Sequence, residues 1–120
     1  MTLKWIAIGS LFAVTASAQT TMDMNMNMDP SGTKFMQDMD VSMKQMDHNM
    51  SEAPMTGNVD HDFAAMMVPH HQGAIDMAKG ELNYGKNPVM RRLAEEIIVD
   101  QESEIAVMDL WLKKDAGTTK

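Results

Sequence analysis

The chain has 120 residues, of which 44% are hydrophobic, and its 17 acidic and 10 basic side chains give a formal net charge of −7. This excess of negative charge argues against nucleic acid and anionic membrane surfaces as partners, and it suits a protein that attracts cations. The sequence contains 16 methionines and no cysteine, so no disulfide stabilises the fold, and the length allows one domain with a modest core.

Residues 1–18 are typical of a secretory signal peptide. Lys4 supplies a positive start, an apolar run follows from Trp5 to Val14, and Ala16-Ser17-Ala18 is the small-residue pattern that a signal peptidase cuts. The alternative is an uncleaved anchor, but a membrane-spanning helix needs about 20 apolar residues and this run is shorter. We predict cleavage near Ala18-Gln19, a mature protein in the periplasm or secreted, and no stable membrane insertion.

Segment 19–32 alternates methionine with Asp or Asn. Strict alternation is the period of a strand, but Asp and Asn are poor strand formers, and Pro30 with Ser31-Gly32 breaks the pattern. We predict a flexible arm that collects metal through its thioethers, because neither core packing nor strand formation accounts for the repeat. The four arm methionines are Met22, Met24, Met26 and Met28.

Residues 33–50 carry methionines at spacings of three and four, which predicts an amphipathic helix. Two interpretations stay open for this seam. It can pack as adaptable apolar filler, or Met39, Met43 and Met46, together with His48, can bind metal. Residues 51–59, with Pro54, predict a linker.

A second helix is predicted for residues 60–84, capped by Asp60 or Asp62 and ended by Gly85. Pro69 lies inside it and should kink it, because proline cannot donate a backbone hydrogen bond. At about 100° per residue one stripe is expected to face the core. Its members are Phe63, Met66, Met67, His70, Ala74, Met77, Ala78 and Glu81.

A third helix is predicted for residues 88–113, with Asn87 as its cap and Pro88 in its first turn. The short turn before it makes the last two helices an antiparallel hairpin. We therefore predict an all-α fold, a three-helix antiparallel bundle that pairing as a homodimer would enlarge, with residues 115–120 as a disordered tail. The apolar stripe of this helix is Met90, Leu93, Ala94, Ile97, Gln101, Glu104, Met108, Trp111 and Leu112.

Polar side chains within these stripes predict a site. An unpaired buried carboxylate is costly, so Glu104 should face a partner, which is either His70 or a backbone amide in a structural pair, or a metal-binding group. Met66 and His70 are four residues apart and point the same way, as are Met67 and His71.

The donor types predict which metal is bound. A thioether is a soft donor that selects Cu(I), needs no deprotonation and forms no disulfide, and imidazole accepts both copper oxidation states. We predict Cu(I) as the bound ion, with Ag(I) as its mimic and Cu(II) as a second possibility.

From Asp60 the chain reads Asp-His-Asp-Phe-Ala-Ala-Met-Met-Val-Pro-His-His-Gln-Gly-Ala-Ile-Asp-Met-Ala. This segment closely resembles an exported ferritin-like family, long labelled a domain of unknown function, that includes the copper-binding protein CopM. The resemblance covers residues 60–112 and implies a helical bundle outside the cytoplasm with a role in copper binding and resistance. The cluster that it implies is Met66, His70, His71, Met77, Gln101, Glu104 and Met108.

Three functions remain to be distinguished. The first is a copper or silver sink or carrier that docks on other periplasmic copper-handling proteins. The second is a ferritin-like metal oxidase, but di-iron sites use Glu-x-x-His motifs and the sequence contains none, so we do not predict an enzyme. The third is a module that binds partner helices through its adaptable methionine seam.

Overall fold

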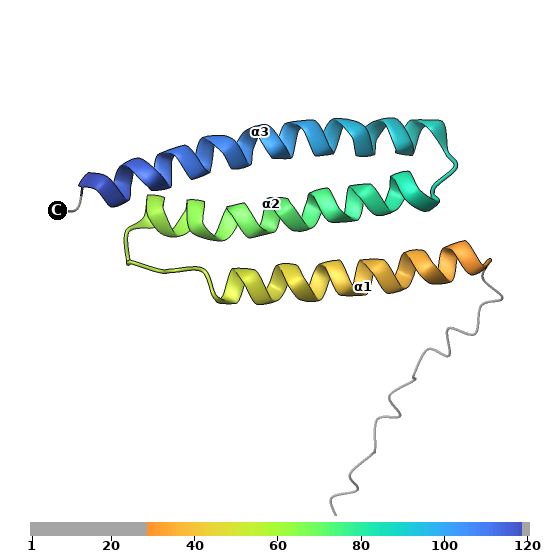
Figure 1. The fold of residues 1–120 in the computed structure, drawn as a ribbon, viewed down its shortest axis with the longest axis horizontal. Coiled ribbons are helices and arrows are strands. Elements are labelled where there is room, and N and C mark those ends of the chain that lie inside the picture. Colours follow the sequence, from red (N-terminus) through yellow and green to blue (C-terminus); the bar gives the residue numbers. More distant parts are fainter. Residues whose placement is uncertain (1–28, 119–120) are drawn as a thin grey trace, which may run out of the picture.

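The computed structural model describes residues 29–118 and forms three α-helices within them: α1 (Pro30–Ser51), α2 (Val59–Tyr84) and α3 (Pro88–Thr118) (Figure 1). The described residues contain no strand, which confirms the all-α prediction. The predicted signal peptide, the four arm methionines and residues 119–120 lie outside the described residues.

Helix α1 begins at Pro30, inside the segment that we predicted as part of the arm. Proline is favoured in the first turn of a helix because its missing N–H has no intrahelical partner there. Asp29 precedes it as the cap, and its carboxylate accepts hydrogen bonds from the backbone N–H and the hydroxyl of Ser31. The residues that looked like a helix breaker therefore form a helix start.

Asn58 caps α2, in place of the predicted Asp60 or Asp62. Its side-chain oxygen accepts from the backbone N–H groups of Asp60 and His61 at 3.0 and 3.2 Å. Asp62 instead accepts from the backbone of the preceding loop, from Thr56 at 2.7 Å and Gly57 at 2.9 Å. These bonds, with that from Thr56 first, hold the pKa of Asp62 below its ordinary value.

The turn between α2 and α3 forms as predicted. Gly85 ends α2, which continues through Pro69 as one helix. The Asn87 side chain caps α3 by accepting from Val89 N–H at 2.9 Å. Arg91 donates from one guanidinium nitrogen to the carbonyls of Leu82 and Gly85, at 2.6 and 3.0 Å, so it satisfies acceptors that the end of α2 leaves free. Helix α3 then continues to Thr118, so residues 115–118 of the predicted tail are helical.

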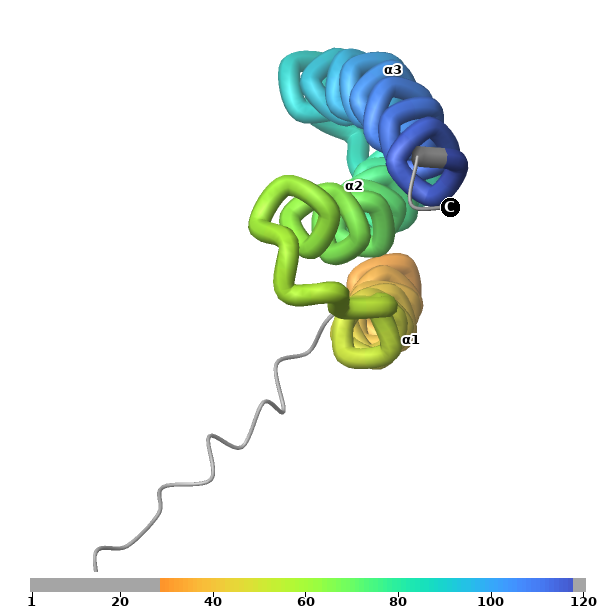
Figure 2. The backbone as a smooth tube through the Cα atoms, turned by 90° about the vertical axis from the view of Figure 1, so that its left-hand side faces the viewer, coloured from red at the N-terminus to blue at the C-terminus, as the bar shows by residue number. Residues whose placement is uncertain are grey.

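The three helices lie side by side in one antiparallel layer with α2 in the middle (Figures 1 and 2). Helix α2 contacts both neighbours, whereas α1 and α3 do not contact each other within the described residues. The buried side chains are consequently few and small, and nearly all belong to the central helix. The buried hydrophobic residues are Ala64, Ala65, Ile75, Ala78 and Ala94.

Glycines in α2 let α1 approach closely. A Cβ atom placed on Gly73 would lie 2.6 Å from the sulfur of Met46, and one on Gly80 would overlap the methyl group of Met39. One hydrogen bond, 2.6 Å from the Tyr84 hydroxyl to the Asp38 carboxylate, joins the same two helices. The methionine seam of α1 therefore packs against α2 through Met39 and Met46, which are half-buried.

The two sides of the layer differ in chemistry. Gln72, Asp76, Lys79 and Asn83 follow one another at helical spacing along one side of α2. The other side, which we call the open face, carries the stripe predicted to face the core, joined by exposed or half-exposed apolar residues of α1 and α3. Its principal residues are Met36, Met43, Phe63, Met67, His70, Ala74, Met77, Met90, Leu93, Ile97, Met108 and Trp111.

The prediction that the α2 stripe faces a core is therefore wrong for the single chain, except at Ala78, which is buried. The buried residues on the α3 side of α2 are Ala64, His71, Ile75 and Ala78, about a quarter of a turn from the centre of the stripe, and of these only Ala78 belongs to it. A central helix has neighbours on two opposite sides, and here it meets them with its smaller residues. None of the described helices combines the length and hydropathy that crossing a membrane requires.

Candidate metal site

A hydrogen bond between α2 and α3 forms the centre of the site. Nε2 of His71 lies 2.6 Å from Oε2 of Glu104, and these residues are 33 positions apart in the chain. The His71 side chain is only 11% exposed, whereas that of Glu104 is 58% exposed. The imidazole is therefore anchored inside the helix pair, and the carboxylate reaches it from the solvent side.

The bond to Glu104 decides which nitrogen of His71 is available. An ionised carboxylate only accepts hydrogen bonds, so Nε2 of the neutral ring carries the proton and donates it. Nδ1 then presents a lone pair, and this atom is buried without a hydrogen-bond partner among the described residues. An oriented imidazole with one nitrogen held by a carboxylate and the other unprotonated is the usual arrangement of a metal-binding histidine.

Sulfur donors lie in the same place. His71 and Glu104 line a groove of about 460 Å³ between α2 and α3 that also contains Met67 and Met108. Met67 precedes His71 by four residues, and Met108 follows Glu104 by four, so each pair lies on one side of its helix. Two thioethers, one imidazole and one carboxylate thus share one groove, whose other lining residues are Phe63, Ser103 and Val107.

A second acceptor lies nearby without a donor. Oε1 of Gln101 is buried and has no hydrogen-bond partner among the described residues, and Gln101 precedes Glu104 by one turn of α3. Native proteins leave few buried polar atoms unpaired, and such atoms often mark a water or ion position. The unpartnered atoms of His71 and Gln101 are both acceptors, and Gln101 does not line the groove around His71.

The structure exchanges the roles that we gave to the two adjacent histidines. His70, predicted on the core side and as one of the alternative partners of Glu104, is exposed on the open face. Its ring centre is 5.8 Å from that of His71, at an interplanar angle of 63°. The prediction was wrong because the helical wheel located the apolar stripe but not the side of α2 on which α3 packs.

The predicted cluster of α2 and α3 residues is only partly assembled. His71, Glu104 and Met108 come together, but Met77 lines a separate groove of about 310 Å³ with Met90 and Leu93. Met66 is half-buried and follows the same stripe of α2 as Gly73, towards α1.

The predicted ligands of α1 are also divided. Met39 and Met46 are taken up by packing against the glycines of α2, whereas Met43 is 51% exposed on the open face. His48 is exposed. Within the described residues, α1 therefore brings no donor into the groove around His71, because none of its side chains lines that groove.

Met67 was missing from the predicted ligand set. The signal was present, since its spacing of four from His71 equals that of Met66 from His70. The two pairs are one residue apart, about 100° around the helix, and the sequence does not indicate which of them faces α3.

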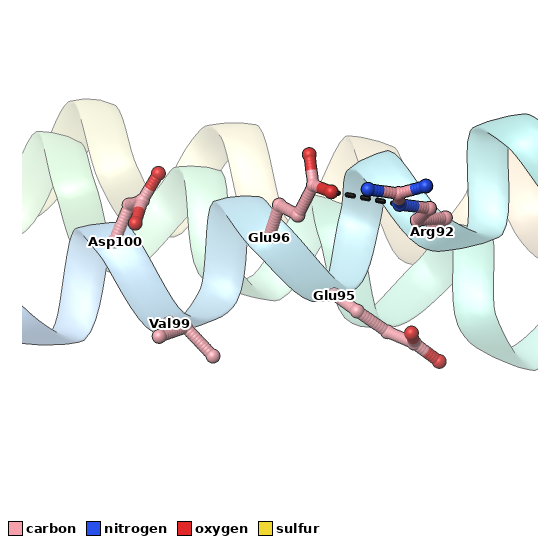
Figure 3. A pocket seen from close by; sticks show the side chains of 5 residues that line it. All are labelled: Arg92, Glu95, Glu96, Val99 and Asp100. Atoms are coloured by element: carbon pink, nitrogen blue, oxygen red, sulfur yellow. Dashed lines mark hydrogen bonds and ion pairs between the residues drawn. The ribbon is translucent and has the colours of Figure 1, made fainter.

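Two further observations limit the choice of site. A hollow on the outer surface of α3 is lined by residues of that helix alone, where Arg92 pairs with Glu96 at 2.9 Å (Figure 3); this charged pair offers no soft donor. Across residues 29–118, no three His, Cys, Asp or Glu side chains are grouped so that they could hold a metal ion.

Comparison with known proteins identifies a matching family. The family model described as "Domain of unknown function (DUF305)" matches residues 8–112. A protein of Acanthamoeba polyphaga mimivirus, described as uncharacterized, is 40% identical over 50 residues, which are 42% of this chain and 33% of the viral protein. The chain thus matches about a third of the length of that curated relative.

Proposed function

The chain belongs to the DUF305 family, a domain of unknown function, and from the chemistry of its own residues we propose that it binds Cu(I) outside the cytoplasm. In this proposal it acts as a sink or carrier in copper homeostasis and resistance, and Ag(I) occupies the same site. The observation that carries the proposal is the groove in which buried His71, held by Glu104, shares its surroundings with Met67 and Met108.

The donor set supports a soft monovalent ion. Thioethers bind Cu(I) well and bind hard cations such as Mg²⁺ and Ca²⁺ poorly, and imidazole is a common copper ligand. In this assignment Met67, Met108 and Nδ1 of His71 are the ligands, and Glu104 orients the imidazole without binding the metal. In this proposal the copper ion is what the protein binds and passes on, and it is not a cofactor for a reaction.

The rest of the chain supports the same proposal. Ten methionines lie between Met22 and Met55, the formal charge is −7 and cysteine is absent, so the sulfur donors form no disulfides in an oxidising compartment. The resemblance to the exported family that includes CopM agrees with an envelope location. The arm methionines add loose capacity for metal, and other copper-handling proteins are the proposed partners for transfer.

We propose binding and not catalysis. A di-iron oxidase of the ferritin-like type takes Glu-x-x-His from each of two helices, and the sequence does not contain this motif. Oxygen consumption by the Cu(I)-loaded protein, above that of free Cu(I), would instead favour an oxidase.

The test is an anaerobic titration of mature protein with Cu(I) against a coloured Cu(I) chelator. Met67→Ala and His71→Ala are expected to remove the tightest binding event while the helix content stays unchanged. Met55→Ala is the matched control, because Met55 is 57% exposed in the α1–α2 connection and does not line the groove. Equal chelator competition by all four proteins would contradict the proposal.

A further inference from the structure

The open face is too large and too apolar to remain uncovered. Phe63, Leu93 and Met43 on it are 62%, 46% and 51% exposed. Helices usually complete a domain by burying an apolar side against a second layer, but the described residues, 29–118, supply only one layer. We infer that a second copy of the chain packs on the open face, giving a two-layer dimer of six helices.

The dimensions of the face fit this occupant. Helix α2 has 26 residues, so at about 1.5 Å per residue and about 9 Å between helix axes, the three-helix face measures about 39 by 27 Å. That is about 1,000 Å², above the roughly 800 Å² per partner of a standard stable interface. A single extended segment, such as residues 19–28, is too narrow to cover three helices side by side.

Charged side chains lie on both sides of the layer. The side of α2 opposite the open face carries Asp76, bonded to Gln72 at 3.1 Å and paired with Lys79 at 3.8 Å. Glu95 and Glu102 of α3 lie on that same side by helical spacing. Two chains that meet at their open faces keep these carboxylates outermost, where water screens them, but they also bring Glu81 and Glu104 of each chain to the interface.

Symmetry locates the middle of the interface. In a two-fold dimer the same patch meets itself, so the axis crosses the centre of the face. The face residues at the centre of α2 are His70 and Ala74. The two copies of His70 therefore lie near the axis. Each His71 groove is covered by the opposite chain, which shields the metal-binding donors of that groove from water.

The first test is the mass of metal-free mature protein by sedimentation equilibrium at micromolar concentrations in the presence of a chelator. Wild-type protein is expected to sediment as a dimer. Ala74→Glu, which places a charge at the centre of the face, is expected to be monomeric with unchanged helix content, and Asn83→Glu on the opposite side is expected to stay dimeric. A monomeric wild type, or a dimer that withstands Ala74→Glu, would overturn the inference.

A second test probes the axis and uses the absence of cysteine from the chain. Mild oxidation of His70→Cys is expected to give a disulfide-linked dimer, because disulfides form only between Cα atoms within about 7 Å, whereas Gln72→Cys is expected to stay uncrosslinked. Crosslinking at Gln72 but not His70 would place the interface on the other side of the layer. A wild type that is monomeric, but dimerises once residues 19–28 are removed, would show that the arm covers the face.

These measurements do not depend on copper binding, because they are made without metal. A dimer that fails to bind Cu(I) would contradict the proposed function alone. A monomer that binds Cu(I) with the His71 groove would contradict the dimer alone.

Discussion

Glu104 and His71 have different expected roles although they are bonded to each other. The carboxylate fixes the ring and its tautomer, while Nδ1 keeps the free lone pair. Loss of an orienting partner of this kind typically lowers metal affinity by about 10–100-fold. Glu104→Ala is therefore expected to weaken Cu(I) binding by that factor without changing the number of ions bound.

The same competition titration distinguishes this role from direct ligation. Glu104→Ala that behaves like His71→Ala, with the tight site lost, would make the carboxylate a ligand. An unchanged affinity would show that the bond to His71 has no part in binding. Glu96→Ala serves as the control, since Glu96 is a carboxylate of the same helix that pairs with Arg92 away from the groove.

At the scale of single residues, the sequence did not predict which histidine pairs with Glu104. The sequence indicates a Met and His site on α2 and α3 and predicts Glu104 and Met108 within it. It cannot choose between His70 and His71, because adjacent residues differ by only about 100° in direction and both have a methionine four positions before them. Only the position of α3 makes that choice.

At the scale of the helices, the contact of α1 with α2 depends on one glycine more than on another. A Cβ on Gly73 would lie 2.6–2.8 Å from three successive atoms of Met46, including its Cβ, so the helix itself must shift. A Cβ on Gly80 would overlap the flexible end of Met39 and would otherwise make an ordinary contact, at 3.5 Å, with the Phe35 ring.

Gly73→Ala is expected to lower the free energy of unfolding by about 1–3 kcal/mol, as overpacking does. Gly80→Ala is expected to be neutral or to stabilise by up to about 1 kcal/mol, because alanine favours a helix. Urea unfolding followed by circular dichroism measures both. Equal destabilisation by the two substitutions would contradict the close contact at Gly73.

The connection between α1 and α2 should respond to acid through Asp62. Its hydrogen bonds from Thr56 and Gly57 hold its pKa below the ordinary value of about 3.9. The stabilisation is therefore fully present above that ordinary value and is lost as the pH falls through the lower pKa of the folded state.

Asp62→Asn is expected to flatten the dependence of unfolding free energy on pH below about 4. Asp60→Asn, which removes the same charge one half-turn earlier, is expected to retain the dependence of the wild type. Urea midpoints measured from pH 6 down to pH 3 give the comparison. A wild type and an Asp62→Asn variant with parallel profiles would show that this loop does not sense acid.

The course of the chain was largely predictable at this scale. The Asn87-Pro88 start and the Gly85 stop have strong local preferences, and a turn of so few residues forces the hairpin. The start of α1 was missed because Pro30 is read as a breaker until the capping role of Asp29 is recognised. The side of each helix that is buried was not predictable, since a wheel does not tell how many neighbours a helix has.

For the whole molecule, the single layer explains why the sequence gives a misleading view of the core. The apolar stripes of α2 and α3 predict a shared interior, but these helices meet through alanines, Ile75 and His71, while glycines of α2 face α1. Hydropathy emphasises large residues, whereas close helix packing uses small ones. The methionine-rich stripes therefore remain available to bind a metal, to pack against a second copy of the chain, or to do both.

Metal should stabilise the folded chain as a whole. An ion that binds only the native state adds about 2.7 kcal/mol when its free concentration is 100 times the dissociation constant. Ag(I), which is not redox-active under these conditions, is therefore expected to raise the urea midpoint of the wild type but not that of His71→Ala. Zn(II) at the same concentration should have little effect, and equal stabilisation by both ions would contradict a soft site.

The most direct measurement is X-ray absorption at the copper edge of mature full-length protein loaded with one equivalent of Cu(I). The four arm methionines are replaced by leucine so that only the helical region binds. A mixed shell of nitrogen and sulfur is predicted, and it should lose its nitrogen in His71→Ala and sulfur in Met67→Ala. A shell of oxygen and nitrogen alone, or one that neither substitution changes, would contradict the copper site between α2 and α3.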